Sequence, residues 1–317
     1  MRESVRPMKC VQCLEQPMPG LRAAGTAVAL GYFDGVHVGH RAVLDAAVRA
    51  AEENGLTAAA FTFTLPHGGA GKGKAILTPR EKLRRMETCG IEAVLCPAFE
   101  EFCALSPEQF VDQVLVRVLR AKRVFTGDDF TFGTHKSGNV EVLRRLCGQR
   151  GIGTEIVPTQ MMDGAAVSST RIRECLEAGE VGEVNALLGE PYAVTLPVQH
   201  GRGLGRTLGF PTINQTFPEG MIVPKLGVYI TETCLNGRWM PSATGLGTRP
   251  TVSSEGTVTC ETFIPDFEGD VYGEQMAVRF LKYLWPSRRF DTLEELTGMV
   301  RQAAQLAREY FQECGPV

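Results

Sequence analysis

Residues 26–40 read TAVALGYFDGVHVGH, and this stretch decides the fold of the first half of the chain. Its apolar start, TAVALGYF at 26–33, predicts a buried β-strand that runs into a glycine-rich turn. The following segment, RAVLDAAVRAAEEN at 41–54, predicts an amphipathic helix that ends at Gly55. A strand, a tight turn and a helix in this order indicate the start of a βαβ unit.

The same alternation continues to about residue 185. Strands are expected at 57–64, 91–96, 122–127 and 153–158, and helices at 80–89, 106–120, 139–150 and 168–181. Ser106 is the expected N-cap of the third helix and Pro107 its first residue. Strands that alternate with helices predict right-handed crossovers and a mostly parallel sheet, so we expect an α/β Rossmann-like domain.

The pattern changes near residue 190, where glycine and proline become frequent between short β-branched runs. Strands are expected at 227–235, 237–246, 257–264 and 275–285. Strands without intervening helices predict a small antiparallel β-barrel. A C-terminal helix is expected at 291–313, with Asp291 as N-cap and Glu294 completing a capping box. We therefore expect two domains, at 15–186 and 190–317.

The composition is that of a folded chain without a nucleic-acid or membrane partner. Of the 317 residues, 44% are hydrophobic and 22% charged, which is enough apolar material for a sizeable core. The 33 basic and 36 acidic side chains give a net charge of −3, whereas nucleic-acid binders usually carry a basic excess. No apolar run approaches the roughly 18 residues of a membrane span, and the N-terminus has no secretory h-region. We expect a cytoplasmic protein.

The ten cysteines give weak evidence for chemistry. Only Cys10 and Cys13 form a CxxC pair, and no second cysteine or histidine pair follows at metal-ligand spacing. The pair also precedes any expected strand or helix. We interpret most of the ten as buried small hydrophobes or idle thiols, with a low expectation of metal or redox function.

The turn after the first strand is a candidate phosphate site. Gly31, Gly35 and Gly39 allow the backbone to turn tightly and approach a ligand. His37 and His40 lie three residues apart where the helix begins, and a helix N-terminus favours phosphate through its N–H groups and dipole. Two imidazoles there could stabilise charge on a phosphate under attack. Two solvent-facing turn histidines are the alternative, which the three glycines, the strand and the helix together disfavour.

Three segments carry a resemblance to a known family. They are ALGYFDGVHVGH at 29–40, FTGDDFTFG at 125–133 and VSSTRIRECLEAGEV at 167–181. HxGH alone marks a broad superfamily of nucleotidylyl transferases. The three segments together resemble the FAD synthetase module of bacterial bifunctional riboflavin kinase/FMN adenylyltransferases, in the same order and spacing. The resemblance covers about residues 15–313.

The resemblance implies an adenylyl-transfer site in the first domain. It assigns His37 and His40 to the ATP phosphates and the transition state. Ser169 and Thr170, at an expected helix N-terminus, would hold β- and γ-phosphates, although simple helix capping is the alternative for that segment alone. The nucleotide-binding residues expected over both domains are Gly31, Asp34, Gly35, Gly39, Asp129, Ser169, Thr170, Arg171, Gly201, Gly205 and Arg206.

HGRGLGRTLGFPTIN at 200–214 resembles the riboflavin kinase signature, a glycine-rich flap that ends in PTxN. Thr212 would offer a hydroxyl and Asn214 a carbonyl to Mg²⁺, which is held largely by substrate phosphates. Glu261 falls on the family's catalytic glutamate, which accepts the proton of the ribityl 5′-hydroxyl, although a lone strand glutamate is more often a solvated residue. The flavin-binding residues expected are Phe130, Phe132, Asn214 and Phe263.

Several positions depart from the family pattern. Lys136 stands where the family usually has an arginine, so a bidentate grip on phosphate would be lost. Phe263 replaces a common histidine and Leu196 a glycine. Trp285 and Ser287 lie where an Arg-x-Glu is usual. These changes concern the flavin-side wall and the kinase rate.

The sequence therefore predicts an enzyme that phosphorylates riboflavin to FMN and then adenylylates FMN to FAD with release of pyrophosphate. Riboflavin, FMN, FAD and ATP are the expected partners, with Mg²⁺ as cofactor, and a weak homo-oligomer is left open. Two alternatives also stay open: that one of the two activities is live, or that the chain is a flavin-sensing regulator on the same fold. Intact HVGH, PTIN and Glu261 favour turnover, because a pure flavin binder does not need them.

Overall fold

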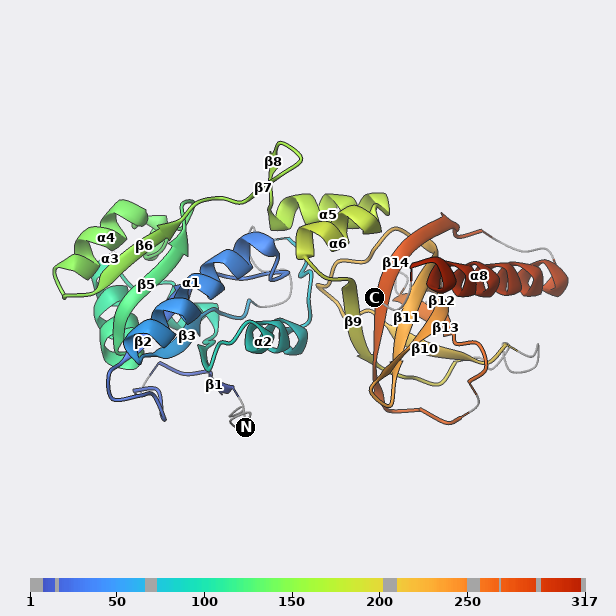
Figure 1. The fold of residues 1–317 in the computed structure, drawn as a ribbon, viewed down its shortest axis with the longest axis horizontal. Helices are drawn as coiled ribbons and strands as arrows, with labels where there is room; N and C mark the ends of the chain where they lie inside the picture. Colours follow the sequence, from blue (N-terminus) through green and yellow to red (C-terminus); the bar gives the residue numbers. More distant parts are fainter. Residues whose placement is uncertain are drawn as a thin grey trace. The chain divides into compact units, whose positions relative to one another are not determined.

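The computed structural model describes residues 8–14, 17–65, 73–201, 210–249, 257–267, 269–288 and 292–314. The chain forms two compact units (Figure 1). The first comprises Met1–Gly73 and Pro79–Ser168, and the second comprises Lys74–Thr78 and Ser169–Val317. Each unit has its own six-stranded sheet. None of the described helices is long and apolar enough to cross a membrane.

The first unit is built on a parallel sheet with the strand order β1-β4-β3-β2-β5-β6. Its strands are β1 (Lys9–Val11), β2 (Thr26–Leu30), β3 (Thr57–Phe61), β4 (Ala93–Leu95), β5 (Ala121–Gly127) and β6 (Gly153–Val157). The expected α/β class and parallel pairing are confirmed. Strand β1 was not expected, because three residues give too short a pattern to identify, and Cys10 lies within it.

Helices connect the parallel strands as expected. The regular helices are α1 (Val38–Asn54), α2 (Pro79–Thr88), α3 (Pro107–Gln109) and α4 (Val140–Gly148), with the π-helical η2 (Phe110–Val118) continuing from α3. Short 3₁₀ turns, η1 (Phe99–Glu101) and η3 (Thr134–Lys136), and a small hairpin, β7 (Met161–Met162) with β8 (Ala165–Ala166), complete the unit. Helix α1 ends at Gly55, which adopts φ 63°, and Ser106 caps α3 by accepting from the Gln109 N–H at 3.2 Å.

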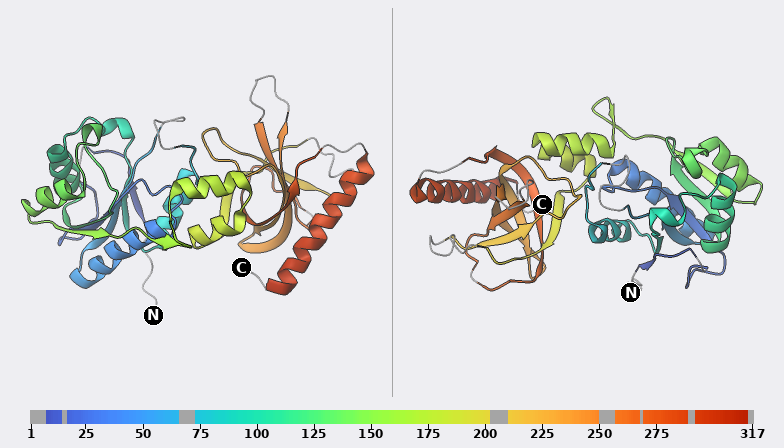
Figure 2. Two further views of the ribbon diagram at one scale, coloured as in Figure 1. Left: turned by 90° about the horizontal axis from the view of Figure 1, so that it is seen from above. Right: turned by 180° about the vertical axis from the view of Figure 1, so that it is seen from behind.

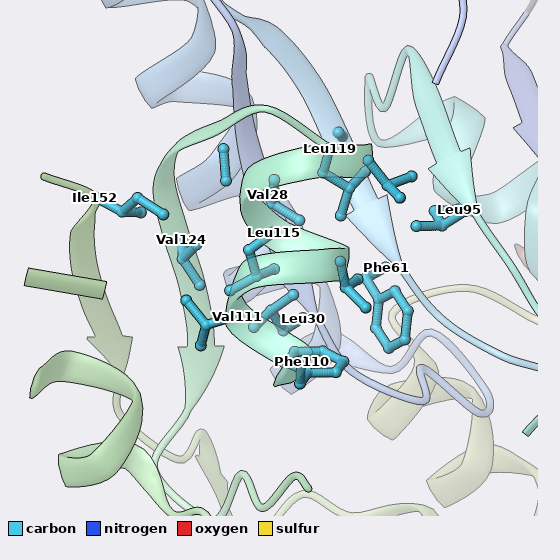
Figure 3. Close-up of a cluster of buried hydrophobic side chains, with 14 of the residues drawn as sticks. Val28, Leu30, Phe61, Leu95, Phe110, Val111, Leu115, Leu119, Val124 and Ile152 are labelled. Atoms are coloured by element: carbon cyan, nitrogen blue, oxygen red, sulfur yellow. The ribbon is translucent and has the colours of Figure 1, made fainter. Parts of the chain in front are cut away.

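The first unit's core lies on one face of the sheet, under η2 (Figure 3). Val28 and Leu30 of β2 point to this face and pack with Phe110 and Leu115 of the helix. Since side chains alternate along a strand, Ala27 and Ala29 lie on the opposite face, where α1 packs against β2 and β3. Small side chains on that face let α1 approach closely, so the turn that begins α1 is held against the end of β2.

The order of strands fixes where a ligand can bind. From β2, the chain proceeds to β3 and β4 on one side, and then crosses to β5 and β6 on the other. In open parallel sheets, ligands bind at the carboxyl ends of the strands where this direction reverses. Here that point lies between β2 and β5, so the turns that follow these two strands form the candidate site.

The second unit is a curled antiparallel sheet with the order β10-β13-β12-β11-β14-β9 (Figure 2). Its strands are β9 (Tyr192–Pro197), β10 (Thr212–Thr216), β11 (Gly227–Leu235), β12 (Arg238–Arg249), β13 (Thr257–Phe263) and β14 (Gln275–Pro286). A bridge between Gln199, just after β9, and Asn214 of β10 joins the two edges. The expected small barrel is confirmed.

Within the described residues, the helices of the second unit are α5 (Ser169–Ala178), α6 (Val181–Leu188) and α8 (Leu293–Cys314). Ala303 and Ala307 of α8 pack on Val228 and Ile230 of β11, so the expected C-terminal helix covers one face of the sheet. Its predicted N-cap, Asp291, lies outside the described residues, and the Thr292 hydroxyl accepts from the Glu295 N–H at 3.2 Å.

The division between compact units lies earlier in the chain than the expected domain boundary at 186–190. Helices α5 and α6 group with the second unit, so the units divide between Ser168 and Ser169. The extent of the two functional domains, 15–186 and 190–317, stays a prediction.

Candidate functional sites in the two units

The turn after β2 has an unusual backbone. Phe33, Gly35 and Val36 all adopt positive φ, at 54°, 86° and 46°. Valine is rare in this region, because its branched Cβ crowds the backbone. The chain therefore reverses within a few residues and places His37 as the N-cap of α1.

His37 is buried, with 6% of its surface exposed, and its Nδ1 accepts a hydrogen bond from the His40 N–H at 3.2 Å. The two imidazoles stack with ring centroids 3.6 Å apart, and Phe33 meets the His40 ring edge-on at 5.4 Å. A Cβ at Gly39 would lie 3.2 Å from the His37 ring, so glycine leaves room for this histidine. The predicted pair thus forms one ordered cluster at the start of α1.

Burial lowers the pKa of His37 to about 4, so the ring is neutral at pH 7. Because Nδ1 is the acceptor of the backbone N–H, the proton lies on Nε2. His37 is therefore an uncharged hydrogen-bond donor through Nε2, set at the N-terminus of a helix of 17 residues. Such a donor can stabilise negative charge that develops on a nearby oxygen.

The turn after β5 supplies the other side of the switch point. Asp128 accepts from the Thr159 hydroxyl at 2.6 Å and from its N–H at 3.2 Å, and the side-chain bond holds the pKa of Asp128 below its ordinary value. Asp129 is exposed, and its Oδ1 would lie 3.2 Å from a Cβ at Gly127. The turns of β2 and β5 thus bring His37 and Asp129 to one edge of the sheet.

The remaining residues predicted for the first site have different surroundings. Asp34 is 4% exposed, inside the same turn as His37. Phe132 is part of the hydrophobic core, and the half-buried Phe130 stacks on it with centroids 5.7 Å apart. Packing alone accounts for Phe132, and flavin binding by either ring stays a prediction.

Ser169, Thr170 and Arg171 form the first turn of α5, in the second compact unit. Thr170 is exposed, and the Arg171 guanidinium donates to the Glu183 carboxylate of α6. The predicted role of this turn in phosphate binding is not tested by contacts within either unit.

The second site lies on two neighbouring strands. Asn214 of β10 is the register partner of Glu261 of β13, and Thr212 is the partner of Phe263. The four side chains leave the same face of the antiparallel pair. Glu261 is exposed and the other three are half-buried. The sheet therefore places the predicted base directly beside the predicted metal ligands.

The glycine-rich segment comes close to this face. A Cβ at Gly201 would lie 2.5 Å from Nδ2 of Asn214, so a larger residue there would require the Asn214 side chain to move. The Asn214 carbonyl accepts from the Gln199 N–H at 2.7 Å, which pins the entry of the segment to β10. Gly205 and Arg206 lie outside the described residues.

The structure adds residues that the sequence analysis missed. The ring of Phe210 meets Phe263 edge-on at 5.5 Å, and the Arg301 guanidinium of α8 lies 5.3 Å above the Phe210 ring. Phe210 precedes the PTIN segment and could have been chosen from it. Arg301 could not, because one arginine on an amphipathic helix gives no signal until the helix is placed on the sheet.

The departures from the family pattern have local explanations. Leu196 is buried in β9, where a side chain fills the barrel interior. Trp285 packs with Val228, Ala303 and Met299 between β11 and α8, and Ser287 is exposed. Trp285 is therefore an apolar contact that secures α8.

Metal ligands are sparse in the described parts of the chain. No group of three or more His, Cys, Asp or Glu side chains there could hold an ion, and Cys10 and Cys13 are exposed free thiols. Thr212 and Asn214 offer two neutral oxygen donors on one face of β10, and the Nδ2 of Asn214 donates to the Thr212 carbonyl at 3.3 Å. This pair suits Mg²⁺, which takes most of its ligands from substrate phosphates and water.

A parallel α/β unit with histidines at a helix N-terminus, followed by a barrel with a carboxylate beside oxygen donors, defines a two-domain ATP-dependent transferase. A family model described as FAD synthetase matches residues 21–171, and one described as riboflavin kinase matches residues 188–311. The chain belongs to the bifunctional riboflavin kinase/FMN adenylyltransferase family.

Relatives with that name match over nearly the whole chain. The Bacillus subtilis protein is 36% identical over 298 residues, covering 91% of this chain and 93% of the relative. The Escherichia coli K12 protein is 34% identical, covering 90% and 93%. A solved structure named as a macrolide-efflux protein from Streptococcus pneumoniae is 27% identical, with TM-score 0.82, and covers 95% of this chain and 99% of that one.

Proposed function

We propose that this chain makes FAD from riboflavin in two ATP-dependent steps, one in each domain. The barrel transfers the γ-phosphate of ATP to riboflavin, giving FMN and ADP. The α/β domain transfers AMP from a second ATP to the FMN phosphate, giving FAD and pyrophosphate. The observation that carries the proposal is that the phosphate-site histidines and the carboxylate Glu261 lie in separate compact units, each in a segment matched by one of the two domain models.

In the adenylyl step, an FMN phosphate oxygen attacks the α-phosphorus of ATP, and the bond to the β-phosphate bridging oxygen breaks. The attacking phosphate is already anionic and needs no base. The catalytic task is to hold the reactants in line and to stabilise charge on the α-phosphate. His37 would donate from Nε2 to an α-phosphate oxygen, and His40, stacked against it, would bind the neighbouring phosphates.

The other nucleotide contacts follow from the same arrangement. Gly31, Gly35 and Gly39 let the turn approach the phosphates, and Asp34 orders the turn from within. Asp129 would contact the nucleotide or flavin from the β5 turn.

We also propose that the first turn of α5 holds the leaving pyrophosphate. Ser169 and Thr170 provide hydroxyls at a helix N-terminus, where the dipole favours anions. Arg171 adds positive charge, which its bond to Glu183 would orient.

In the kinase step, Glu261 would accept the proton of the ribityl 5′-hydroxyl as that oxygen attacks the γ-phosphorus and ADP leaves. Thr212 and Asn214 would hold Mg²⁺ together with ATP oxygens, and the ion would neutralise charge on the phosphates. The register of β10 and β13 supports this division of labour, because Asn214 faces Glu261. Gly201, Gly205 and Arg206 would contact the nucleotide.

The flavin ring has a proposed wall in each domain. In the barrel, Phe263 would contact the isoalloxazine, with Phe210 packed edge-on behind it and Arg301 over Phe210. In the α/β domain, Phe130 and Phe132 would serve, with the partly exposed Phe130 as the direct contact. We place the enzyme in the cytoplasm and expect no nucleic-acid or membrane partner, while weak self-association remains open.

A product assay tests this function. Purified chain is incubated with riboflavin, ATP and Mg²⁺, and the flavins are separated by chromatography. We expect FMN first and FAD later, and FAD alone when FMN replaces riboflavin. Accumulation of FMN without FAD would leave the kinase as the only live activity. Flavin binding with neither product would identify a regulator and refute the proposal.

A further inference from the structure

Two buried cations of α2 lie behind the turn that carries His37. Lys82 is 7% exposed and Arg85 is fully buried, which is unusual for either residue type. Their neighbour on the helix, Glu81, is also buried. Burying such charges costs free energy unless they are well hydrogen-bonded. The hydrogen-bond partners of these cations therefore indicate their structural role.

Lys82 forms hydrogen bonds with residues just after the ends of β2 and β3. Its Nζ donates to the Tyr32 carbonyl at 3.3 Å, to the Thr62 hydroxyl at 3.1 Å and to the Phe63 carbonyl at 3.2 Å. The Thr62 hydroxyl itself donates to the Tyr32 carbonyl at 2.8 Å. Burial lowers the pKa of Lys82, and the nearby Asp34 opposes that change. The ammonium group thus ties the start of the turn to the neighbouring strand.

Arg85 forms a hydrogen bond with the same turn, at the residue two positions before His37. Its Nη1 donates to the Gly35 carbonyl at 3.3 Å, and its Nε donates to Glu81 at 3.3 Å, which fixes the guanidinium. A third cation, Arg41 of α1, donates from Nε to the Val36 carbonyl at 3.3 Å. Three carbonyls of one short turn are therefore bonded to cationic side chains.

These bonds act on a turn that is strained. Phe33 and Val36 are non-glycine residues at positive φ, a strained state that persists only where the surroundings enforce it. A carbonyl oxygen that turned toward a phosphate would also repel it. The cations hold the Tyr32 and Gly35 carbonyls on the α2 side of the turn, away from such a position.

We propose that Lys82 and Arg85 are positioning residues for adenylyl transfer, which hold the turn at 31–36 so that His37 Nε2 meets the α-phosphate. This inference rests on the proposed role of the first domain. Neither residue touches substrate. Their effect passes through the turn to His37, whose donor is needed most in the transition state, so kcat should fall more than substrate binding.

The test replaces each cation by an apolar side chain of similar length. For Lys82→Met and Arg85→Met, we expect kcat for FAD formation from FMN to fall about 10–100-fold, the loss usual for residues that orient a catalytic group, with KM for ATP and FMN changed by less than about twofold. Arg85→Lys keeps a cation near Gly35 and should recover part of the rate. Arg80→Met, an exposed arginine of the same helix, is the matched control and should behave as wild type.

Each measurement has an internal reference. FMN formation from riboflavin should stay at the wild-type rate in every variant, and both tryptophans, Trp239 and Trp285, lie in the second unit, so their fluorescence checks that unit alone. Hydrogen exchange at β2 amides checks the first unit. If the Met variants lose protection there, Thr62→Val becomes the deciding test of the positioning role. This change removes the hydroxyl that accepts from Lys82 Nζ and keeps the side-chain volume. We expect it to lower kcat about threefold or more.

The outcomes separate the inference from the function on which it rests. Each of three outcomes would overturn the positioning role. The first is folded Met variants with wild-type kcat, and the second is a rise in KM that accounts for the whole loss of kcat/KM. The third is a wild-type rate in Thr62→Val after the Met variants unfold. Failure of the wild-type chain to form FAD from FMN would instead refute the proposed function.

Discussion

Asn214 and Glu261 face each other across the β10–β13 pair as register partners, although they are far apart in the chain. Residues paired in this way have Cβ atoms about 4.5–5.5 Å apart, so the two side chains share one site. One contributes a neutral carbonyl oxygen and the other a carboxylate. A base beside a metal ligand can take a proton from a hydroxyl while the ion holds the phosphate that the hydroxyl attacks.

Glu261→Gln should therefore impair the kinase step. Glutamine keeps the size and accepts a hydrogen bond but cannot hold the proton, so kcat for FMN formation should fall roughly 10²–10⁴-fold with little change in KM for riboflavin. FAD formation from supplied FMN should be unchanged. The exposed Glu274→Gln in the same unit is the control. Normal FMN formation by Glu261→Gln would mean that another group is the base.

Thr212→Val tests the proposed metal ligand. Removing the hydroxyl should raise the Mg²⁺ concentration needed for half-maximal FMN formation by about tenfold, since one good hydrogen-bonding or ligand interaction is worth about 1–1.5 kcal/mol. Thr216→Val changes the same residue type on the same face of β10 and should leave the Mg²⁺ requirement of FMN formation unchanged. Neither variant should change the Mg²⁺ requirement of FAD formation. The readout is FMN yield in a Mg²⁺ titration. Equal requirements in the two variants would count against Thr212 as a ligand.

The sequence predicted most of the described helices and strands and assigned each candidate catalytic residue to one of the two expected domains. The alternation of strands and helices predicted the parallel sheet, because it is a local pattern. The first helix was expected from residue 41, whereas α1 begins at Val38 within the HxGH segment. The buried stack of His37 on His40 was not predictable, since it depends on the positive φ of Phe33 and Val36. A sequence does not show that a valine occupies such a conformation.

Long-range contacts explain what else was missed. Lys82 and Arg85 lie within the helix expected at 80–89, and only the placement of α2 reveals the carbonyls that they bond. From the sequence, Trp285 is a departure from the arginine that is usual in the family, whereas the structure shows that its side chain packs with residues of α8. In each case the decisive neighbour is distant in the chain.

Trp285→Arg should destabilise the second unit. The indole packs with Val228, Ala303 and Met299. Loss of a large buried aromatic side chain usually costs about 3–5 kcal/mol of stability, and the half-buried Trp285 should cost part of that. The exposed Ser287→Glu should leave stability unchanged. Thermal unfolding followed by Trp239 fluorescence measures both. If Trp285→Arg instead keeps the wild-type Tm and lowers KM for riboflavin, the position acts on the flavin.

His37→Ala or His40→Ala should abolish FAD formation while FMN accumulates. Removal of one preorganised donor to developing charge costs on the order of 10²–10³ in rate. The barrel has its own sheet and core, so the kinase step should proceed at the wild-type rate. The assay follows both flavins in one reaction that starts from riboflavin. Normal FAD yield from the double variant would remove the histidines from the mechanism.

The burial of His37 also predicts how stability depends on pH. Its pKa is about 4 in the folded state, below the unfolded value of about 6.5. Above pH 6.5 the ring is neutral in both states and contributes no pH dependence. As the pH falls from 6.5 to 4, the unfolded chain takes up a proton that the folded chain does not, so stability is lost over this window and the loss levels off below pH 4.

A comparison with His37→Asn isolates this contribution, because asparagine can still cap α1 but does not titrate. Two and a half pKa units correspond to about 3 kcal/mol, so the first unit of the wild type should lose up to that much more stability than the variant between pH 7 and pH 4. Since the first unit has no tryptophan, urea unfolding is followed by hydrogen exchange of its β2 and β3 amides. The carboxylates are common to both proteins and cancel in the difference. If wild type and variant lose the same stability, the folded pKa of His37 is ordinary, and burial does not keep the ring neutral below pH 6.5.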